Sequence, residues 1–473
     1  MDDLCYLTAT EAAAAVRGAR VTSETLVRAA LERCAAVNPV LNAAVELAAD
    51  SALARASEAD AAAASGRWWG PLHGVPVTVK ESFAVAGMRN TAGAPFLKDH
   101  LAREDAEAVA RLKRAGAVVI GTTNVPLLLG DFQSYNDLYG TTNNPWDLAR
   151  TSGGSSGGSA AALAAGIGHL TLGSDLGGSI RVPAHFCGVF GHKPTLNVVP
   201  LDGHIPPPPG VPPQPPPELP VAGPLARSAD DLLLAMQVLG GPAGDDAVAY
   251  QWHLPAPRQA QLDDYRIGVM LDDPGCPVAG DVRAVLAKAV GALGRSGVVI
   301  EEGWPEGIAP LEQYEAYKLM LRAFFQAAAP MDPPPPLVTH REHARANSLR
   351  MAARAAWQAY FRDHDAFLVP AAFVPAFPHD HSAPPRETGF FESPRVIATA
   401  EGPRRYDDML FWQAFATFSG LPATVAPVGQ TASGLPVGIQ IIGPYLEDAT
   451  PIDLAGRLCE LVGGFERPPL EIA

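Results

Sequence analysis

Three short segments combine serine, glycine and lysine in patterns that could support nucleophilic catalysis. They are VTVK at 77–80, GGSSGG at 153–158 and DLGGSIR at 175–181. The two glycines before Ser179 allow a tight turn with converging N–H groups, which would suit the oxyanion of a tetrahedral intermediate. Read alone, the same residues more often form a simple turn capped by serine.

Lys80 and Ser155 could supply the proton transfers that such a serine needs. Lys80 ends an alternating, strand-like run, where a lysine usually emerges into solvent. If it is buried instead, loss of hydration lowers its pKa, and a neutral lysine can accept a proton from a serine. Ser155 and Ser156 lie in a glycine-rich loop followed at once by the Ala-rich, helix-forming stretch 160–168. We therefore expect an anchored loop that can hold strained backbone.

In this order and spacing, the three segments closely resemble the amidase signature family. Ser179 follows Ser155 by 24 positions, and the similarity is dense from about 70 to 195. It returns in three shorter segments, 221–228, 419–429 and 434–444. The segments that carry the resemblance are GVPVTVKES at 74–82, TSGGSSGGSAAALAAG at 151–166 and GSDLGGSIRVPAHFCGVFGHKPT at 173–195.

The resemblance implies a role for each matching residue. Ser179 would be the acylated nucleophile, Ser155 a proton relay preceded by a cis peptide bond, and Lys80 the general base. The expected oxyanion hole consists of the backbone N–H groups of Leu176, Gly177, Gly178 and Ser179. The loops would be braced by Ser156, Asp175 and Arg181. The substrate pocket would be lined by Phe132, Gln133, Tyr135 and Asn136. The implied reaction requires no metal and no cofactor.

The implied fold is α/β, with a mixed, mostly parallel central sheet of about 11 strands and helices on both faces. The patterns at 74–80, 105–115 and 117–121 (strand, helix, strand) agree with parallel pairing. We expect four segments, which are an N-terminal helical segment packing on the core at 1–65, the catalytic core at 66–240, a variable helical region forming the substrate pocket at 241–410, and the C-terminal part of the same core at 411–473.

Local patterns give further expectations for individual segments. A helix is predicted from Ser23 to Pro39, and another over 43–65. The Pro-rich stretch 205–224 is predicted to be a surface connection that cannot pair as a central strand. Residues 375–405 are predicted to form a loop or lid, and 143–147 a turn.

Composition excludes several classes of function. Thirty-five Lys and Arg against 50 Asp and Glu give a net charge of −15, which disfavours nucleic acid and anionic membranes as partners. No signal peptide or membrane span is expected. The five cysteines are scattered and lack CxxC spacing, so a disulfide framework is not expected and a cytoplasmic location fits. A small molecule remains as the expected partner, for a monomer or a homodimer.

Other readings of the same residues stay open. GGSSG also matches the nucleophile elbow of Ser-His-Asp hydrolases, which requires a strand directly before it. Cys187 could be catalytic, but a buried free cysteine is more common. His379, Asp380 and His381 could bind zinc or form a solvated loop. A glutaminase subunit of a tRNA-dependent amidotransferase is an alternative within the family.

The substrate is expected to be an aryl or alkyl amide, with an ester or an aryl carbamate also possible. This expectation rests on aromatic residues of the variable half, although many of these must belong to an ordinary core. They are Trp357, Phe361, Phe373, Phe377, Phe411, Trp412 and Phe415. Departures from the usual family pattern also affect the expected substrate, not the reaction class. They are Thr122, Leu127, His185 and His192.

Overall fold

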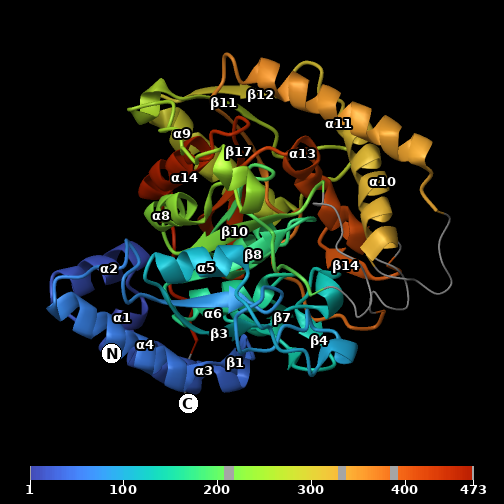
Figure 1. Ribbon diagram of the computed structural model, residues 1–473. Coiled ribbons are helices and arrows are strands. Elements are labelled where there is room, and N and C mark those ends of the chain that lie inside the picture. The colour runs from blue at the N-terminus through green and yellow to red at the C-terminus, as the bar shows by residue number, and fades with distance from the viewer. Residues whose placement is uncertain (1, 207–217, 329–336, 384–392, 471–473) are drawn as a thin grey trace.

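A single large sheet runs through the computed structural model, which describes residues 2–206, 218–328, 337–383 and 393–470. Figure 1 shows this sheet surrounded by helices. It has 11 strands, in the spatial order β1 (Ala44–Leu47), β3 (Val118–Thr123), β2 (Pro76–Lys80), β8 (Leu170–Asp175), β10 (Val221–Ala226), β9 (Phe190–Lys193), β16 (Ala423–Gln430), β17 (Pro436–Ile442), β13 (Ala366–Pro370), β11 (Arg266–Val269) and β12 (Val299–Glu302). The expected mixed sheet of about 11 strands is therefore confirmed.

The pairing is less parallel than expected. Four neighbouring pairs are parallel, namely β2 with β3, β2 with β8, β11 with β12 and β11 with β13. The other six pairs are antiparallel. β8 and β9 run in the same direction, as the intervening helix α7 (Arg181–Cys187) predicts, but β10 lies between them and opposes both. Helix–strand alternation constrains the direction of the strands it joins, not which strands become neighbours.

Helices cover both faces of the sheet. One row consists of α5 (Glu107–Arg114), α8 (Ala229–Leu239), α14 (Ala449–Val462) and α9 (Gly280–Arg295), which contact one another in that order (Figure 1). The other face carries α7, α6 (Gly157–Ala164), α3 (Ser23–Leu41) and α4 (Ala49–Ala64). A further group packs together at one side, formed by α10 (Pro310–Ala328), α11 (His340–Tyr360) and α13 (Phe411–Ser419).

Remaining short elements lie outside these layers. They include the N-terminal helices α1 (Asp2–Cys5) and α2 (Ala9–Arg17). Three two-stranded ribbons are formed by β4 (Tyr135–Asn136) with β5 (Gly140–Thr141), β6 (Asn143–Asn144) with β7 (Asp147–Thr151), and β14 (Val396–Thr399) with β15 (Gly402–Arg405). No helix in the described ranges is long and apolar enough to cross a membrane.

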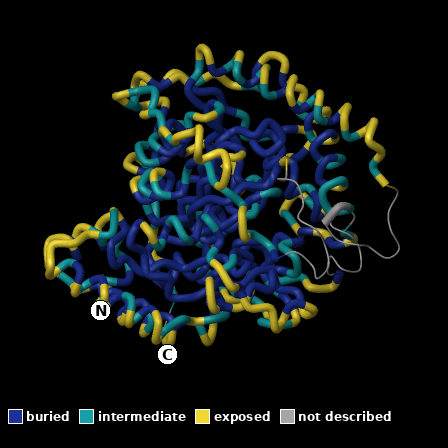
Figure 2. The backbone as a smooth tube through the Cα atoms, in the orientation of Figure 1, coloured by how far each residue is buried: buried dark blue, intermediate teal, exposed yellow. Residues whose placement is uncertain are grey.

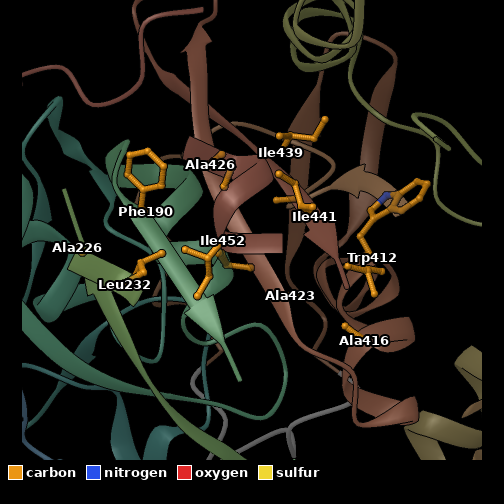
Figure 3. Packing of buried hydrophobic residues seen from close by; sticks show 14 of the residues in the cluster. Phe190, Ala226, Leu232, Trp412, Ala416, Ala423, Ala426, Ile439, Ile441 and Ile452 are labelled. Carbon is orange, nitrogen blue, oxygen red and sulfur yellow. The ribbon is translucent and has the colours of Figure 1, made fainter. Parts of the chain in front are cut away.

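Two hydrophobic clusters stabilise the layers. Alternate residues of β3 belong to different clusters, with Val118 and Ile120 in one and Val119 in the other. This is the pattern expected of a strand covered on both faces. Figure 2 shows the continuous buried interior, and Figure 3 shows Ile439 and Ile441 of β17 within the larger cluster, near Trp412. Because both faces are buried, the central strands hold the Lys80 and Ser179 segments in a rigid frame.

Several local predictions are wrong. Helix α3 runs past Pro39 to Leu41, because a proline in the last turn removes only one hydrogen bond. The stretch expected to be helical at 43–65 begins with strand β1, which pairs with β3 before α4 starts. Strand β10 begins at Val221, inside the stretch predicted to be a surface connection, and pairs on both sides despite Pro224.

Two more expectations concern loops. The Pro-rich residues 207–217 lie outside the described residues, so the expected surface connection is not described there. The expected loop at 375–405 contains the β14–β15 hairpin, and its residues 384–392 are not described. The expected turn at 143–147 runs into the ribbon strand β7. A nucleophile elbow requires a strand of the central sheet directly before the serine. β7 belongs to a separate ribbon, so it does not meet this requirement.

The buried frame leads to a stability prediction. Ile441 of β17 is fully buried between two antiparallel neighbours, so Ile441→Ala should lower the free energy of unfolding by about 2–5 kcal/mol. Val248 is 90% exposed, and Val248→Ala should change the free energy of unfolding by no more than about 0.5 kcal/mol. Guanidinium unfolding of the two variants measures both values. Equal stabilities would contradict this account of the core.

Candidate active site

Lys80 lies at the end of β2 and is completely buried. Its Nζ is 2.7 Å from Ser155 Oγ and 3.0 Å from Ser174 Oγ, with the Ser174 carbonyl oxygen at 3.5 Å. Ser174 comes from β8, the parallel neighbour of β2. Val79 of β2 pairs with Leu172 of β8. Strand register therefore places the amine against the serine-bearing segments.

Burial lowers the pKa of the Lys80 amine well below its ordinary value. The nearby Asp175 carboxylate acts in the opposite direction, but more weakly. No carboxylate is paired directly with this lysine among the described residues. A lysine in such surroundings favours the neutral form, which is the form able to accept a proton.

The loop that carries Ser155 is anchored and not a flexible linker. The peptide bond between Gly154 and Ser155 is cis, as the family resemblance implied. Ser134 Oγ donates to the Gly153 carbonyl at 3.0 Å and accepts from the Gly157 N–H at 3.0 Å, which fastens both ends of the loop. The chain then enters α6 directly, so the loop has little freedom to move.

Ser179 lies between β8 and α7, in the turn that the two glycines were expected to make. Gly178 adopts φ +102°, a conformation that a residue with a side chain rarely takes. The Ser156 N–H donates to the Ser179 carbonyl at 3.1 Å and joins the two serine loops. Ser179 is partly exposed, whereas Ser155 is buried. The two loops are therefore adjacent, but the hydroxyl groups of Ser155 and Ser179 share no hydrogen bond within the described part of the chain.

A buried ion pair braces the Ser179 turn. Asp175 accepts hydrogen bonds from the N–H groups of Gly178 and Ile180 at 2.9 and 3.0 Å, and it pairs with Arg181 at 2.8 Å. Although burial opposes ionisation, Arg181 lowers the pKa of Asp175 to about 2. Arg181 also donates to Gln440 Oε1 at 2.6 Å. The turn is thereby fixed to β17, a strand from the far end of the chain.

Three backbone N–H groups of this turn remain open. Those of Leu176, Gly177 and Ser179 have no partner within the described residues, whereas the N–H of Gly178 is taken by Asp175. In this structure the Gly178 N–H, which was expected in the oxyanion hole, therefore donates to the Asp175 carboxylate. The sequence could not show this, because the hydrogen bond depends on how the Asp175 side chain folds back over the turn.

The four expected pocket residues differ in their surroundings. The Phe132 ring packs near the ring of Tyr406, and the Tyr135 ring stacks on His381. Gln133 makes two hydrogen bonds with the backbone of Asp380, at 2.6 and 2.9 Å. The Asn136 side chain donates to Asn124 and Val125 and accepts from two N–H groups of its own turn. Asn136 is thus fully engaged in bracing that turn.

Most of the remaining candidate residues are buried. All seven aromatic residues proposed for the pocket are buried, as an ordinary core requires. His185 and His192 are also buried, and they bond to Gly438 and Asp448 respectively. His381 stacks on Tyr135, and no cluster of three potential metal ligands occurs within the described ranges.

The cysteines form no disulfide framework within the described residues. All five are buried and free of disulfides. The thiol of Cys187 donates to the Ser152 carbonyl at 3.4 Å, and burial raises its pKa. A high thiol pKa disfavours the thiolate that a cysteine nucleophile needs.

Sequence reasoning missed two residues next to Lys80. Ser174 lies inside the segment that carries the family resemblance, but nothing in its local pattern distinguished it from the other serines. His204 Nε2 lies 3.0 Å from Ser174 Oγ. For Ser174 the available signal was strand register, which places residues near 173 beside Lys80 once β2 and β8 are paired.

Comparisons with known proteins place the whole chain among amidases. The family profile described as Amidase matches residues 25–334 and 336–451. The indoleacetamide hydrolase of Bradyrhizobium diazoefficiens is 34% identical over 473 residues, covering 93% of this chain and 84% of that protein. A glutamyl-tRNA(Gln) amidotransferase subunit from Anaeromyxobacter dehalogenans is 32% identical over 496 residues, covering 99% of this chain and 98% of that protein.

A solved structure described as a crystal structure of amidase superposes with a TM-score of 0.80 at 29% identity. The superposition covers 97% of this chain and 100% of the other. With a family profile that spans most of the chain, and relatives above 30% identity over nearly its full length, the protein belongs to the amidase signature family of hydrolases.

Proposed function

We propose that this protein hydrolyses a C–N amide bond through an acyl-enzyme on Ser179, with Ser155 as proton relay and Lys80 as general base. The contact between the buried Lys80 amine and Ser155 Oγ, at 2.7 Å, is the observation that carries the proposal. A serine is a weak nucleophile until a base removes its proton. In this proposal the buried, neutral lysine supplies that base by way of Ser155, whose loop is joined to the Ser179 turn by the Ser156 N–H.

In the proposed reaction, Lys80 takes the proton of Ser155, and Ser155 takes the proton of Ser179. The Ser179 oxygen attacks the carbonyl carbon of the amide and forms a tetrahedral oxyanion. Ser155 then returns a proton to the departing nitrogen, the C–N bond breaks, and the acyl group remains on Ser179. Water activated by the same relay hydrolyses the ester and restores the serine.

The oxyanion hole proposed here consists of the N–H groups of Leu176, Gly177 and Ser179. Their availability in the described structure supports the proposal, and the bond from Gly178 to Asp175 leaves Gly178 as a brace. Donors fixed before the reaction stabilise a developing negative charge without reorganisation. Asp175 and Arg181 are proposed to hold the turn in this geometry, as their buried ion pair suggests.

The proposed substrate is a neutral aryl or alkyl amide, with an ester or an aryl carbamate as a further possibility. Near Gly177 lie the side chain of Leu410 and the hydroxyl of Tyr317, neither of which carries a charge. Arg395 lies over the Tyr406 ring and is already paired with Asp131 at 2.9 Å. The relative named for indoleacetamide hydrolysis also supports an aromatic, uncharged acyl group.

A glutaminase subunit of a tRNA-dependent amidotransferase is the second candidate. The similarity to the Anaeromyxobacter amidotransferase protein, over nearly the whole of both chains, favours it. The two candidates share the acyl-enzyme chemistry and differ in substrate and partners. We rank the stand-alone hydrolase higher, because the groups near Gly177 are uncharged, whereas glutamine carries a charged amino group and a charged carboxylate.

The first prediction concerns the nucleophile. Ser179→Ala should abolish amide hydrolysis, because no oxygen remains to attack, while the far-ultraviolet circular dichroism and the melting temperature stay close to wild type. Ser57→Ala, an exposed serine on α4, is the matched control and should keep full activity. Mass spectrometry of the protein quenched during turnover should locate the acyl group on the peptide that contains Ser179. Normal turnover in Ser179→Ala would contradict the proposal.

The second prediction concerns the base. The protonated amine cannot accept a proton, so kcat/KM should fall as the pH drops through the pKa of Lys80. Because burial lowers this pKa, the acidic limb should lie well below the pH at which a free lysine titrates.

Lys80→Arg is the corresponding variant. Arginine stays protonated, so the variant should lose at least about 100-fold in kcat/KM. Lys288→Arg, on the exposed face of α9, should behave as wild type. A wild-type rate and pH profile in Lys80→Arg would rule out Lys80 as the base.

The third prediction separates the two candidate functions. The purified chain alone should hydrolyse neutral aryl or alkyl amides, measured as kcat/KM across primary amides, p-nitroanilides, esters and aryl carbamates. Native mass spectrometry of the same sample gives its assembly state. Activity on glutamine that appears only with added amidotransferase partner proteins would favour the glutaminase instead. Strict preference for charged amides would contradict the proposed pocket.

A further inference from the structure

His204 reaches Lys80 through one intervening hydroxyl. Its Nε2 is 3.0 Å from Ser174 Oγ, and the same oxygen is 3.0 Å from Lys80 Nζ. The loop that carries His204 is bound to the segment just after Lys80, because Ala84 N–H donates to the Gly203 carbonyl at 2.9 Å and Ile205 N–H to the Ser82 carbonyl at 2.7 Å. The imidazole is therefore held in place beside the lysine.

The Lys80 amine has only one arrangement of hydrogen bonds that suits a base. A neutral amine carries two N–H groups and one lone pair, and it faces the Ser155 hydroxyl, the Ser174 hydroxyl and the Ser174 carbonyl. If both N–H groups donate to Ser174, the lone pair faces Ser155 and can accept its proton. If the Ser174 hydroxyl donates to the amine instead, the lone pair is occupied and Ser155 receives an N–H.

The direction of the Ser174 hydroxyl decides between these arrangements. This hydroxyl has one proton, and His204 Nε2 and the Lys80 lone pair are both within reach of it. A neutral imidazole accepts at Nε2 when its proton is on Nδ1. Burial and the neighbouring Lys80 lower the pKa of His204 to about 3, so the ring stays neutral at ordinary pH. Asp175 is the charged group that acts on the pKa of the lysine.

We propose that His204 is a positioning residue, which accepts the Ser174 hydroxyl proton at Nε2 and thereby reserves the Lys80 lone pair for Ser155. The inference rests on the proposed function, because it requires Lys80 to act as the base. It assigns no reaction step to His204 itself. Its ring makes no hydrogen bond with Ser155 or Ser179 within the described residues, and it packs against the ring of Phe83, at 4.4 Å between centroids.

Two substitutions separate the acceptor from the ring. His204→Phe keeps an aromatic ring beside Phe83 but removes the acceptor, whereas His204→Gln can place an amide oxygen near the position of Nε2. We expect kcat for an amide substrate to fall by at least about tenfold in His204→Phe, with KM changed less than about twofold. His204→Gln should recover part of the loss. A wild-type kcat in His204→Phe, or an equal loss in both variants, would overturn the inference.

A double-mutant cycle tests whether His204 acts through Ser174. In a Ser174→Ala background the hydroxyl is absent, so adding His204→Phe should cost little further activity. The same fold-loss in both backgrounds would indicate a packing role and overturn the inference. The wild-type protein provides a measurement that needs no folded variant, because nitrogen-15 NMR of the histidines reports the tautomer. A proton on Nε2 of His204 would overturn the inference.

The outcome for Ser179→Ala distinguishes the two levels of the argument. If that variant remains active, the proposed function fails and the role of His204 fails with it. If Ser179→Ala is inactive and His204→Phe has wild-type kcat, the proposed function stands and the positioning role alone is wrong.

Discussion

The state of one buried amine determines what the rest of this structure can do. Lys80 is enclosed by β2, β8 and the Ser155 loop, and no carboxylate forms an ion pair with it among the described residues. A buried charge without a partner is costly, so burial favours a neutral lysine. Burial is consequently the larger influence on the pKa of the amine, and the Asp175 carboxylate acts more weakly in the opposite direction.

The arrangement around this amine depends on contacts between distant parts of the chain. Arg181, which pairs with Asp175 beside the Ser179 turn, also bonds to Gln440 of β17 and to Thr417 of α13. Both members of the ion pair are buried, and removing one would leave a desolvated charge in the core. The same ion pair therefore holds the turn and joins it to the C-terminal strands, which couples the geometry of the site to the completeness of the fold.

Much of the fold followed from the sequence. The resemblance led to an α/β protein with about 11 strands. Alternating apolar residues located β2, and a compact apolar run located β3. The sequence did not reveal that β10 inserts between β8 and β9, or that β1 pairs with β3. Both strands have weak local patterns, AVEL in a helix-forming context and a segment that contains Pro224, and both are stabilised by the edges they pair with. Local propensity is overridden where such tertiary pairing is available.

For the site, the sequence alone determined the residue types, their order and the family to which they point, because glycine positions and serine spacing are properties of the chain itself. Only the tertiary structure decided that Lys80 is buried, that Gly178 donates to Asp175, and that Ser174 and His204 lie beside the amine. Those features depend on which strands become neighbours and in which register. The physical reason is that desolvation and hydrogen-bond direction arise from atoms brought together across the sheet, such as Val79 beside Leu172, and no local pattern encodes them.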